Sequence, residues 1–207
     1  FHPMKHSAAK LRRWLRFNLF YLGHPPWDTG VSPPELIQLL KATTPGRALD
    51  VGCGTGTNLV TMGTYGWEVV GVDIAWLSVL KARQKIRKAQ MRSRVYHADV
   101  SGQLRMENTF DLVLDIGCFH SLSGLEKGRY QQNLRAWLGE SGTYLLYAHQ
   151  RISPSSDHGI TEEDLDTFKT FLSLTWLNVG DELRPDGGVG RQAAWARFDR
   201  KEKSSSF

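Results

Sequence analysis

The chain has little of what would place it in a membrane or in an oxidising compartment. Two cysteines occur among its 207 residues, Cys53 and Cys118, too few for a disulfide framework, so a reducing, cytoplasmic setting is expected. No apolar run reaches the roughly 18 to 20 residues that cross a bilayer. The basic N-terminus is not followed by the apolar stretch and small-residue cleavage site of a signal peptide. We therefore expect one globular unit of ordinary size.

Acidic residues are missing from residues 1–24, which contain five lysines and arginines: Lys5, Lys10, Arg12, Arg13 and Arg16. These five account for the whole net charge of +5, so the rest of the chain is formally neutral. A neutral body does not provide an extended track for phosphates, so nucleic acid is not an expected partner.

The basic N-terminal arm has helical periodicity. Between residues 7 and 22 the apolar positions Leu11, Trp14, Leu15, Leu19 and Leu22 recur close to the helical period. Such a helix either forms a lid that packs its apolar face over the cofactor or lies on a membrane, with residues 5–22 in peripheral contact with the inner surface. We prefer the lid, because the segment that follows points to an active site.

A glycine loop stands between two short apolar strands. Leu49-Asp50-Val51 runs into Gly52-Cys53-Gly54-Thr55-Gly56, and 17 residues after Gly56 a second strand, Val69–Val72, ends at Asp73. Glycine lets the backbone turn sharply and approach a ligand closely. A carboxylate at the tip of the next parallel strand can accept hydrogen bonds from both ribose hydroxyls. The pairing predicts a nucleoside-binding crevice.

The spacing Gly-x-Gly-x-Gly differs from the dinucleotide fingerprint Gly-x-Gly-x-x-Gly, although NAD remains an alternative. Asp50 before the first glycine would repel a pyrophosphate and suits a positively charged ligand. The segment resembles motif I of the class I methyltransferases that use S-adenosylmethionine (SAM) and release S-adenosylhomocysteine. That resemblance implies cofactor contacts from Asp50, Gly52, Gly54, Gly56, Asp73, Ile74, Asp99, Val100 and Asp115.

Strands and helices alternate after residue 46, which predicts a parallel sheet with helices on both faces. Predicted strands cover 47–51, 68–72, 94–97, 110–115, 142–148, 172–179 and 193–199; predicted helices cover 57–65, 76–90 and 126–138, and one opens at Thr161. The resemblance implies a Rossmann-like sheet of seven strands, mostly parallel, whose last strand is antiparallel. Residues 1–46 form the arm and lid helices, with Ser32 as an N-cap; 47–200 form the SAM-binding domain, and 201–207 a disordered tail.

Pro26-Trp27-Asp28-Thr29-Gly30 is similar to a segment of the thiol and halide methyltransferases, relatives of the thiopurine methyltransferases. The likeness implies that this segment closes over SAM and that Trp27 shields its sulfonium, to which a tryptophan ring is attracted. The alternative is a tryptophan packed in a turn whose Asp28 caps local amides.

Methyl transfer from a sulfonium requires alignment and exclusion of water more than it requires a catalytic triad or a metal. Candidate catalytic residues are His120, Tyr147 and Tyr21, with His120 either a general base or a structural hydrogen-bonding residue. We predict in-line transfer to a small-molecule nucleophile, most simply a thiol, halide or related soft acceptor. Two alternatives remain: a membrane-surface enzyme acting on a lipid headgroup or lipophilic amine, and a SAM- or nucleic-acid-binding protein without turnover.

Overall fold

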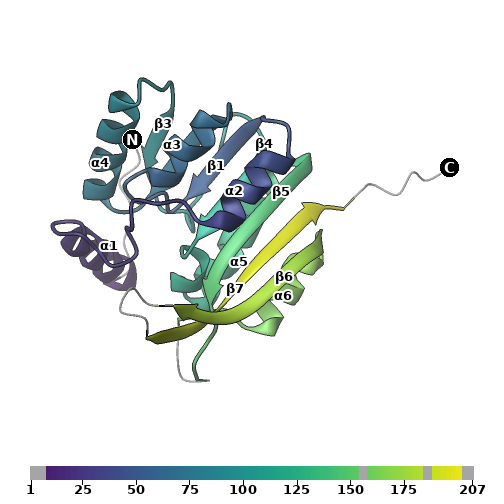
Figure 1. Cartoon of the computed structure of the whole chain (residues 1–207). Coiled ribbons are helices and arrows are strands. Elements are labelled where there is room, and N and C mark those ends of the chain that lie inside the picture. Colours follow the sequence, from purple (N-terminus) through teal and green to yellow (C-terminus); the bar gives the residue numbers. More distant parts are fainter. Residues whose placement is uncertain (1–7, 154–157, 184–187, 202–207) are drawn as a thin grey trace.

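A single seven-stranded sheet forms the centre of the molecule (Figure 1), with strand order β3-β2-β1-β4-β5-β7-β6. The computed structural model describes residues 8–153, 158–183 and 188–201. The strands are β1 Arg47–Val51, β2 Glu68–Asp73, β3 Arg94–His97, β4 Phe110–Ile116, β5 Leu138–His149, β6 Leu172–Leu183 and β7 Val189–Arg200. The predicted Rossmann-like class is confirmed.

Strands β1 to β5 run parallel, and β7 lies antiparallel between β5 and β6. The prediction that the last strand is the antiparallel one is therefore correct. Because β1 sits between β2 and β4, the loops that follow these three strands open at the same edge of the sheet. That edge is where open α/β sheets bind their ligands.

Helices cover both faces of the sheet, as the alternation predicted. One face carries α2 Pro34–Ala42, α3 Thr57–Thr64 and α4 Trp76–Lys88; the other carries α5 Gly124–Trp137 and α6 Glu162–Lys169. Strand side chains alternate between the two faces: Leu112 and Leu114 join the core under α2, α3 and α4, whereas Val113 joins the core under α5 and α6.

The arm forms helix α1, Ala8–Phe20, which packs against α4 through a bond from the Leu77 amide to Asn18 Oδ1, 3.2 Å. Figure 1 shows α1 (purple) at the margin of the molecule. No helix of the described residues has the length and apolar character needed to cross a membrane.

Ser32 does not cap the helix that follows it, contrary to the sequence expectation. The N-cap position is Pro33, which has no side chain able to cap. The Ser32 hydroxyl instead lies 2.7 Å from Asn58 Oδ1 and 2.8 Å from Thr61 Oγ1, so it ties the N-terminal segment to α3. The predicted tail after Lys201 and most of the turn between β6 and β7 lie outside the described residues.

Candidate active site

The glycine loop after β1 adopts backbone angles that side chains disfavour. Gly54 and Gly56 have φ of +54° and +83°, in the left-handed region where glycine is the default residue. A Cβ on Gly54 would lie 3.0 Å from the Tyr21 hydroxyl, and one on Gly56 would lie 3.0 Å from the Cβ of Ala82. The loop therefore forms a close-fitting cradle, with Gly52 (φ +71°) at its start.

Asp73 holds the tip of β2 against this loop. Its Oδ2 accepts a hydrogen bond from the Gly54 amide at 2.9 Å, and its Oδ1 accepts one from the Ala75 amide at 2.7 Å. Burial raises the pKa of the carboxyl, and the two amide donors oppose that shift. The carboxylate that the sequence assigned to ribose thus lies directly beside the glycine cradle, with Ile74 next in the chain.

Asp50 is a buried carboxylate on β1. It is 1% exposed, and within the described residues its Oδ2 has no hydrogen-bond partner. Burial, together with the nearby Asp115 and Asp73, raises its pKa well above the ordinary value. A buried carboxylate without a donor is destabilising unless a cation or donor reaches it, so this position fits a positively charged cofactor.

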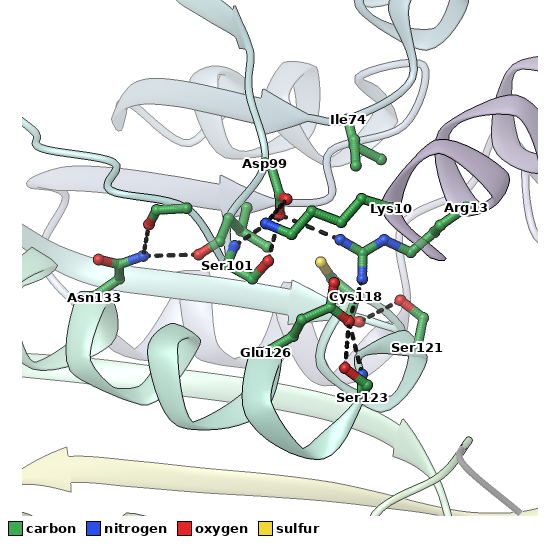
Figure 2. A network of polar contacts seen from close by, with 12 residues as sticks. Lys10, Arg13, Ile74, Asp99, Ser101, Cys118, Ser121, Ser123, Glu126 and Asn133 are labelled. Atoms are coloured by element: carbon green, nitrogen blue, oxygen red, sulfur yellow. Dashed lines mark hydrogen bonds and ion pairs between the residues drawn. The ribbon is translucent and has the colours of Figure 1, made fainter. Parts of the chain in front are cut away.

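Asp99, which follows β3, is bound by two cations of the arm (Figure 2). Lys10 Nζ lies 2.8 Å from its Oδ2 and Arg13 lies 3.3 Å from its Oδ1. Its Oδ1 also accepts from the Ser101 amide and hydroxyl at 2.9 and 2.7 Å. Burial works against ionisation, but Lys10 and Ser101 hold the pKa of Asp99 below its usual value. The next residue, Val100, packs in the core and its carbonyl accepts from the Asn133 amide group at 2.8 Å.

Helix α1 thus covers the ligand-binding edge of the sheet. Arg13 spans from Asp99 to Glu126 on α5, 2.6 Å from the Glu126 Oε2 (Figure 2). Tyr21 is 4% exposed beside Gly54, and Lys81 of α4 donates to its carbonyl at 2.7 Å. Burial, followed by the charge of Asp73, raises the pKa of Tyr21, so its hydroxyl stays protonated.

The Pro-Trp-Asp segment is attached to the glycine loop. Asp28 Oδ1 accepts a bond from the Thr55 hydroxyl at 2.9 Å, which links the segment to the cradle. The indole of Trp27 donates to the Tyr21 hydroxyl at 3.3 Å, and its ring contacts that of Phe20 edge-on at 4.8 Å between centroids. Half of Trp27 remains exposed. The segment therefore lies where a cover for the cofactor is expected.

His120 lies in the short 3-10 helix η1, Phe119–Ser121, after β4. Its Nδ1 accepts a hydrogen bond from the His149 amide at 3.0 Å, and the two imidazoles stack with centroids 4.6 Å apart. Burial, followed by the neighbouring His149, lowers the pKa of His120 to about 3. With Nδ1 occupied, the ring proton of neutral His120 sits on Nε2, which makes that nitrogen a hydrogen-bond donor.

Tyr147 and His149, two residues apart on β5, both meet Glu182 on β6. The Tyr147 hydroxyl donates to Glu182 Oε1 at 3.1 Å, and His149 Nε2 lies 3.2 Å from Glu182 Oε2. Burial and the Glu182 charge raise the pKa of the Tyr147 hydroxyl. Sequence analysis did not single out Glu182, since its partners are more than thirty positions away and no local motif surrounds it.

Asp115 is fully buried at the end of β4. Its Oδ1 accepts from the Cys118 amide at 2.8 Å, and its Oδ2 accepts from the Tyr130 hydroxyl at 2.7 Å. Burial raises its pKa to about 7. The carboxyl therefore organises the loop that carries His120. No cluster of three or more potential metal ligands occurs in the part of the chain that the structure describes.

Comparison with known proteins identifies the family. A family model described as a methyltransferase domain matches residues 48–142. An uncharacterized methyltransferase of Schizosaccharomyces pombe is 33% identical over 100 residues, which are 48% of this chain and 68% of that protein. The chain belongs to the class I SAM-dependent methyltransferases. SAM is accordingly its methyl donor.

Two relatives are similar over most of this methyltransferase. A 2-heptyl-1-hydroxyquinolin-4(1H)-one methyltransferase of Mycobacteroides abscessus is 24% identical over 82% of this chain and 80% of its own. A probable thiol methyltransferase of Arabidopsis thaliana is 24% identical over 89% of this chain and 83% of its own. Among solved structures, the N-methyltransferase NodS of Bradyrhizobium japonicum, in complex with S-adenosylhomocysteine, has a TM-score of 0.77 at 15% identity, over 91% of this chain and 98% of that one. This structural likeness concerns the fold alone.

Proposed function

We propose that this methyltransferase transfers the methyl group of SAM to the sulfur of a small-molecule thiol. The observation that carries the proposal is the group of proton-handling side chains at the ends of β4 and β5, where His120, His149 and Glu182 lie together. A halide acceptor has no proton to lose, whereas a thiol with a pKa of about 8.5 must ionise to become a good nucleophile. These side chains therefore favour a protic acceptor over a halide.

The residues on and around the glycine loop suit the cofactor. We assign Asp73 to the ribose, Asp99 and Val100 to the adenine, and the glycine loop with Asp50 to the methionine end. SAM supplies, when bound, a methyl group already activated by its sulfonium. Because Lys10 and Arg13 bind Asp99 through both of its oxygens, we expect at least one of them to shift when a ligand takes a bond from that carboxylate.

On the acceptor side, each group has a separate task. Glu182 lies 3.2 Å from His149 Nε2 and orients the imidazole, which is the group assigned to accept the thiol proton. His120 offers its Nε2 proton to the developing thiolate. Tyr147 donates to Glu182 Oε1, the carboxylate oxygen that does not face His149, and so fixes the orientation of the carboxylate. Helix α1 and Trp27 exclude water and hold the reacting atoms within the roughly 3 Å that in-line displacement requires.

The test is release of S-adenosylhomocysteine from SAM over a panel of aromatic and alkyl thiols of graded pKa, with iodide, amines and phenols as further arms. We expect turnover on thiols. Glu182→Gln should lower kcat/KM about 10²-fold for alkyl thiols at neutral pH and far less for thiols already ionised. Glu163→Gln, an exposed change on α6, is the matched control. Iodide turnover without thiol turnover, or equal losses across the thiol series, would argue against the proposal.

A second candidate acceptor is an acidic hydroxyl group on a heteroaromatic ring, favoured by the long match to the hydroxyquinolone methyltransferase. It places the same demand on His149 and Glu182, because an O–H must also lose its proton. A 1-hydroxyquinolone in the panel distinguishes the two: preference for it over every thiol by kcat/KM would move the assignment from sulfur to oxygen.

A further inference from the structure

The surface of α1 that faces away from the protein is apolar. Leu11, Leu15, Leu19 and Leu22 recur along one side of the helix and its end, with side chains 44%, 46%, 64% and 72% exposed. We call these four leucines, together with Arg12 and Arg16, the outer face of α1. The spacing of three to four residues places them in one stripe.

The opposite side of α1 is polar and aromatic. Arg13 binds Asp99 and Glu126, Asn18 binds the Leu77 amide, and Tyr21 is buried beside the glycine loop. The helix is thus inverted relative to an ordinary surface helix, which buries its aliphatic stripe and exposes its charges. Leucines placed outward on a helix that is already anchored by its polar side indicate a binding surface.

The charge beside the leucines is of one sign. Arg12 and Arg16 are exposed, and residues 8–27 contain no aspartate or glutamate. An anionic lipid leaflet has negatively charged headgroups above apolar acyl chains. The arginines are complementary to the headgroups and the leucines to the acyl chains. A second copy of the chain is a poor match, since its outer face of α1 carries the same positive charge.

Further exposed apolar side chains occur at the end of α1 and on α4. Phe20 and Trp27 are 42% and 49% exposed and contact each other edge-on. Trp76 and Leu80, each 42% exposed, belong to α4, the helix against which α1 packs. Aromatic rings with a polar edge are favoured at the boundary between lipid headgroups and acyl chains.

We propose that the outer face of α1 docks this methyltransferase on an anionic lipid surface, with the helix lying in the plane of the interface. Docking uses Leu11, Leu15, Leu19, Leu22, Arg12 and Arg16, and leaves the contacts of Lys10 and Arg13 with Asp99 in place. The inference is independent of the methyl acceptor, because none of the docking side chains contacts the residues assigned to the acceptor.

The experiment is co-sedimentation of the full chain with vesicles of phosphatidylcholine alone and with about 30% phosphatidylserine. We expect sedimentation with the anionic vesicles only, weakening as salt rises. Leu15→Gln and Leu19→Gln should each lower the partition coefficient about fivefold, and Arg12→Gln also about fivefold. Leu125→Gln and Arg129→Gln are the matched controls: both residues are exposed, and both lie on α5 at the other face of the sheet.

Three outcomes would overturn the proposal. The first is no sedimentation with anionic vesicles at low salt. The second is binding that the arginine change weakens and the leucine changes leave intact, which would indicate a charge contact without insertion. The third is a concentration-dependent dimer, detected by light scattering, that Leu15→Gln and Leu19→Gln abolish while vesicle binding is unaffected. Circular dichroism and S-adenosylhomocysteine binding verify that each variant is folded.

Discussion

His120 offers a quantitative test of the site geometry through the pH dependence of stability. Its pKa is lowered to about 3 in the folded protein, against about 6.5 in an unfolded chain. Between these values the unfolded state binds more protons, so the free energy of unfolding falls as the pH falls below about 6.5. At pH 4.5, two pH units below the unfolded value, the loss due to this one residue is about 3 kcal/mol.

His120→Asn isolates that contribution. The Asn side-chain oxygen can occupy the place of Nδ1 and accept from the His149 amide, but it does not titrate. We expect the variant to be about 1–2 kcal/mol less stable than wild type at pH 7.5, because it leaves part of the ring volume empty. At pH 4.5 we expect it to match or exceed wild type, because the acid-induced loss is absent.

The assay is urea unfolding followed by circular dichroism at the two pH values, with the exposed His24→Asn as control. The difference in unfolding free energy between wild type and His120→Asn should change by about 3 kcal/mol between pH 7.5 and 4.5. The control should show no such change. If the free energies of unfolding of wild type and His120→Asn change equally with pH, His120 is not held neutral. That result would favour His120 as the general base.

Two further predictions concern the cofactor. Asp73→Ala removes the carboxylate beside the Gly54 amide; we expect the Kd for S-adenosylhomocysteine to rise at least about 100-fold by calorimetry, and near-native affinity would contradict the assignment. Asp50→Asn should weaken SAM and S-adenosylhomocysteine by similar factors of about 10, because both carry the ammonium group; loss confined to SAM would instead place the sulfonium at Asp50. Asp166→Asn, an exposed carboxylate on α6, is the control for both.

The sheet was predictable because its signals are local. Leu49-Asp50-Val51 before the glycines and Val69–Val72 before Asp73 are apolar runs that must be buried on both faces. Their order with the intervening helices then determines a parallel arrangement. The same locality explains why the glycine loop and Asp73 were found together: the Gly54 amide donates to the Asp73 carboxylate across 19 residues, within a single strand-helix-strand unit.

Other parts of the site depend on contacts that no local pattern encodes. Glu182 meets Tyr147 across β7, because the pairing of β5 with β7 and of β7 with β6 sets the register of the outer strand. The periodicity of α1 identified an amphipathic helix, but the expectation that its apolar face packs over the cofactor was wrong: the leucines are exposed, and Arg13 on the inner side reaches Asp99 and Glu126. The sequence around Ser32 is typical of an N-cap, yet its hydroxyl bonds to α3. Side chains brought close by the tertiary structure compete with the local backbone amides for such a hydroxyl.

The buried carboxylates near the glycine loop explain how one site can separate the two positive charges of SAM. Asp73 and Asp115 already accept bonds from backbone amides or a tyrosine hydroxyl, whereas Asp50 Oδ2 accepts none from the described residues. A sulfonium has no hydrogen to donate, so it cannot satisfy that oxygen, but an ammonium can. We therefore expect the ammonium at Asp50. We propose that the aromatic rings of Trp27 and Tyr21 meet the sulfonium, because the face of an aromatic ring attracts a cation.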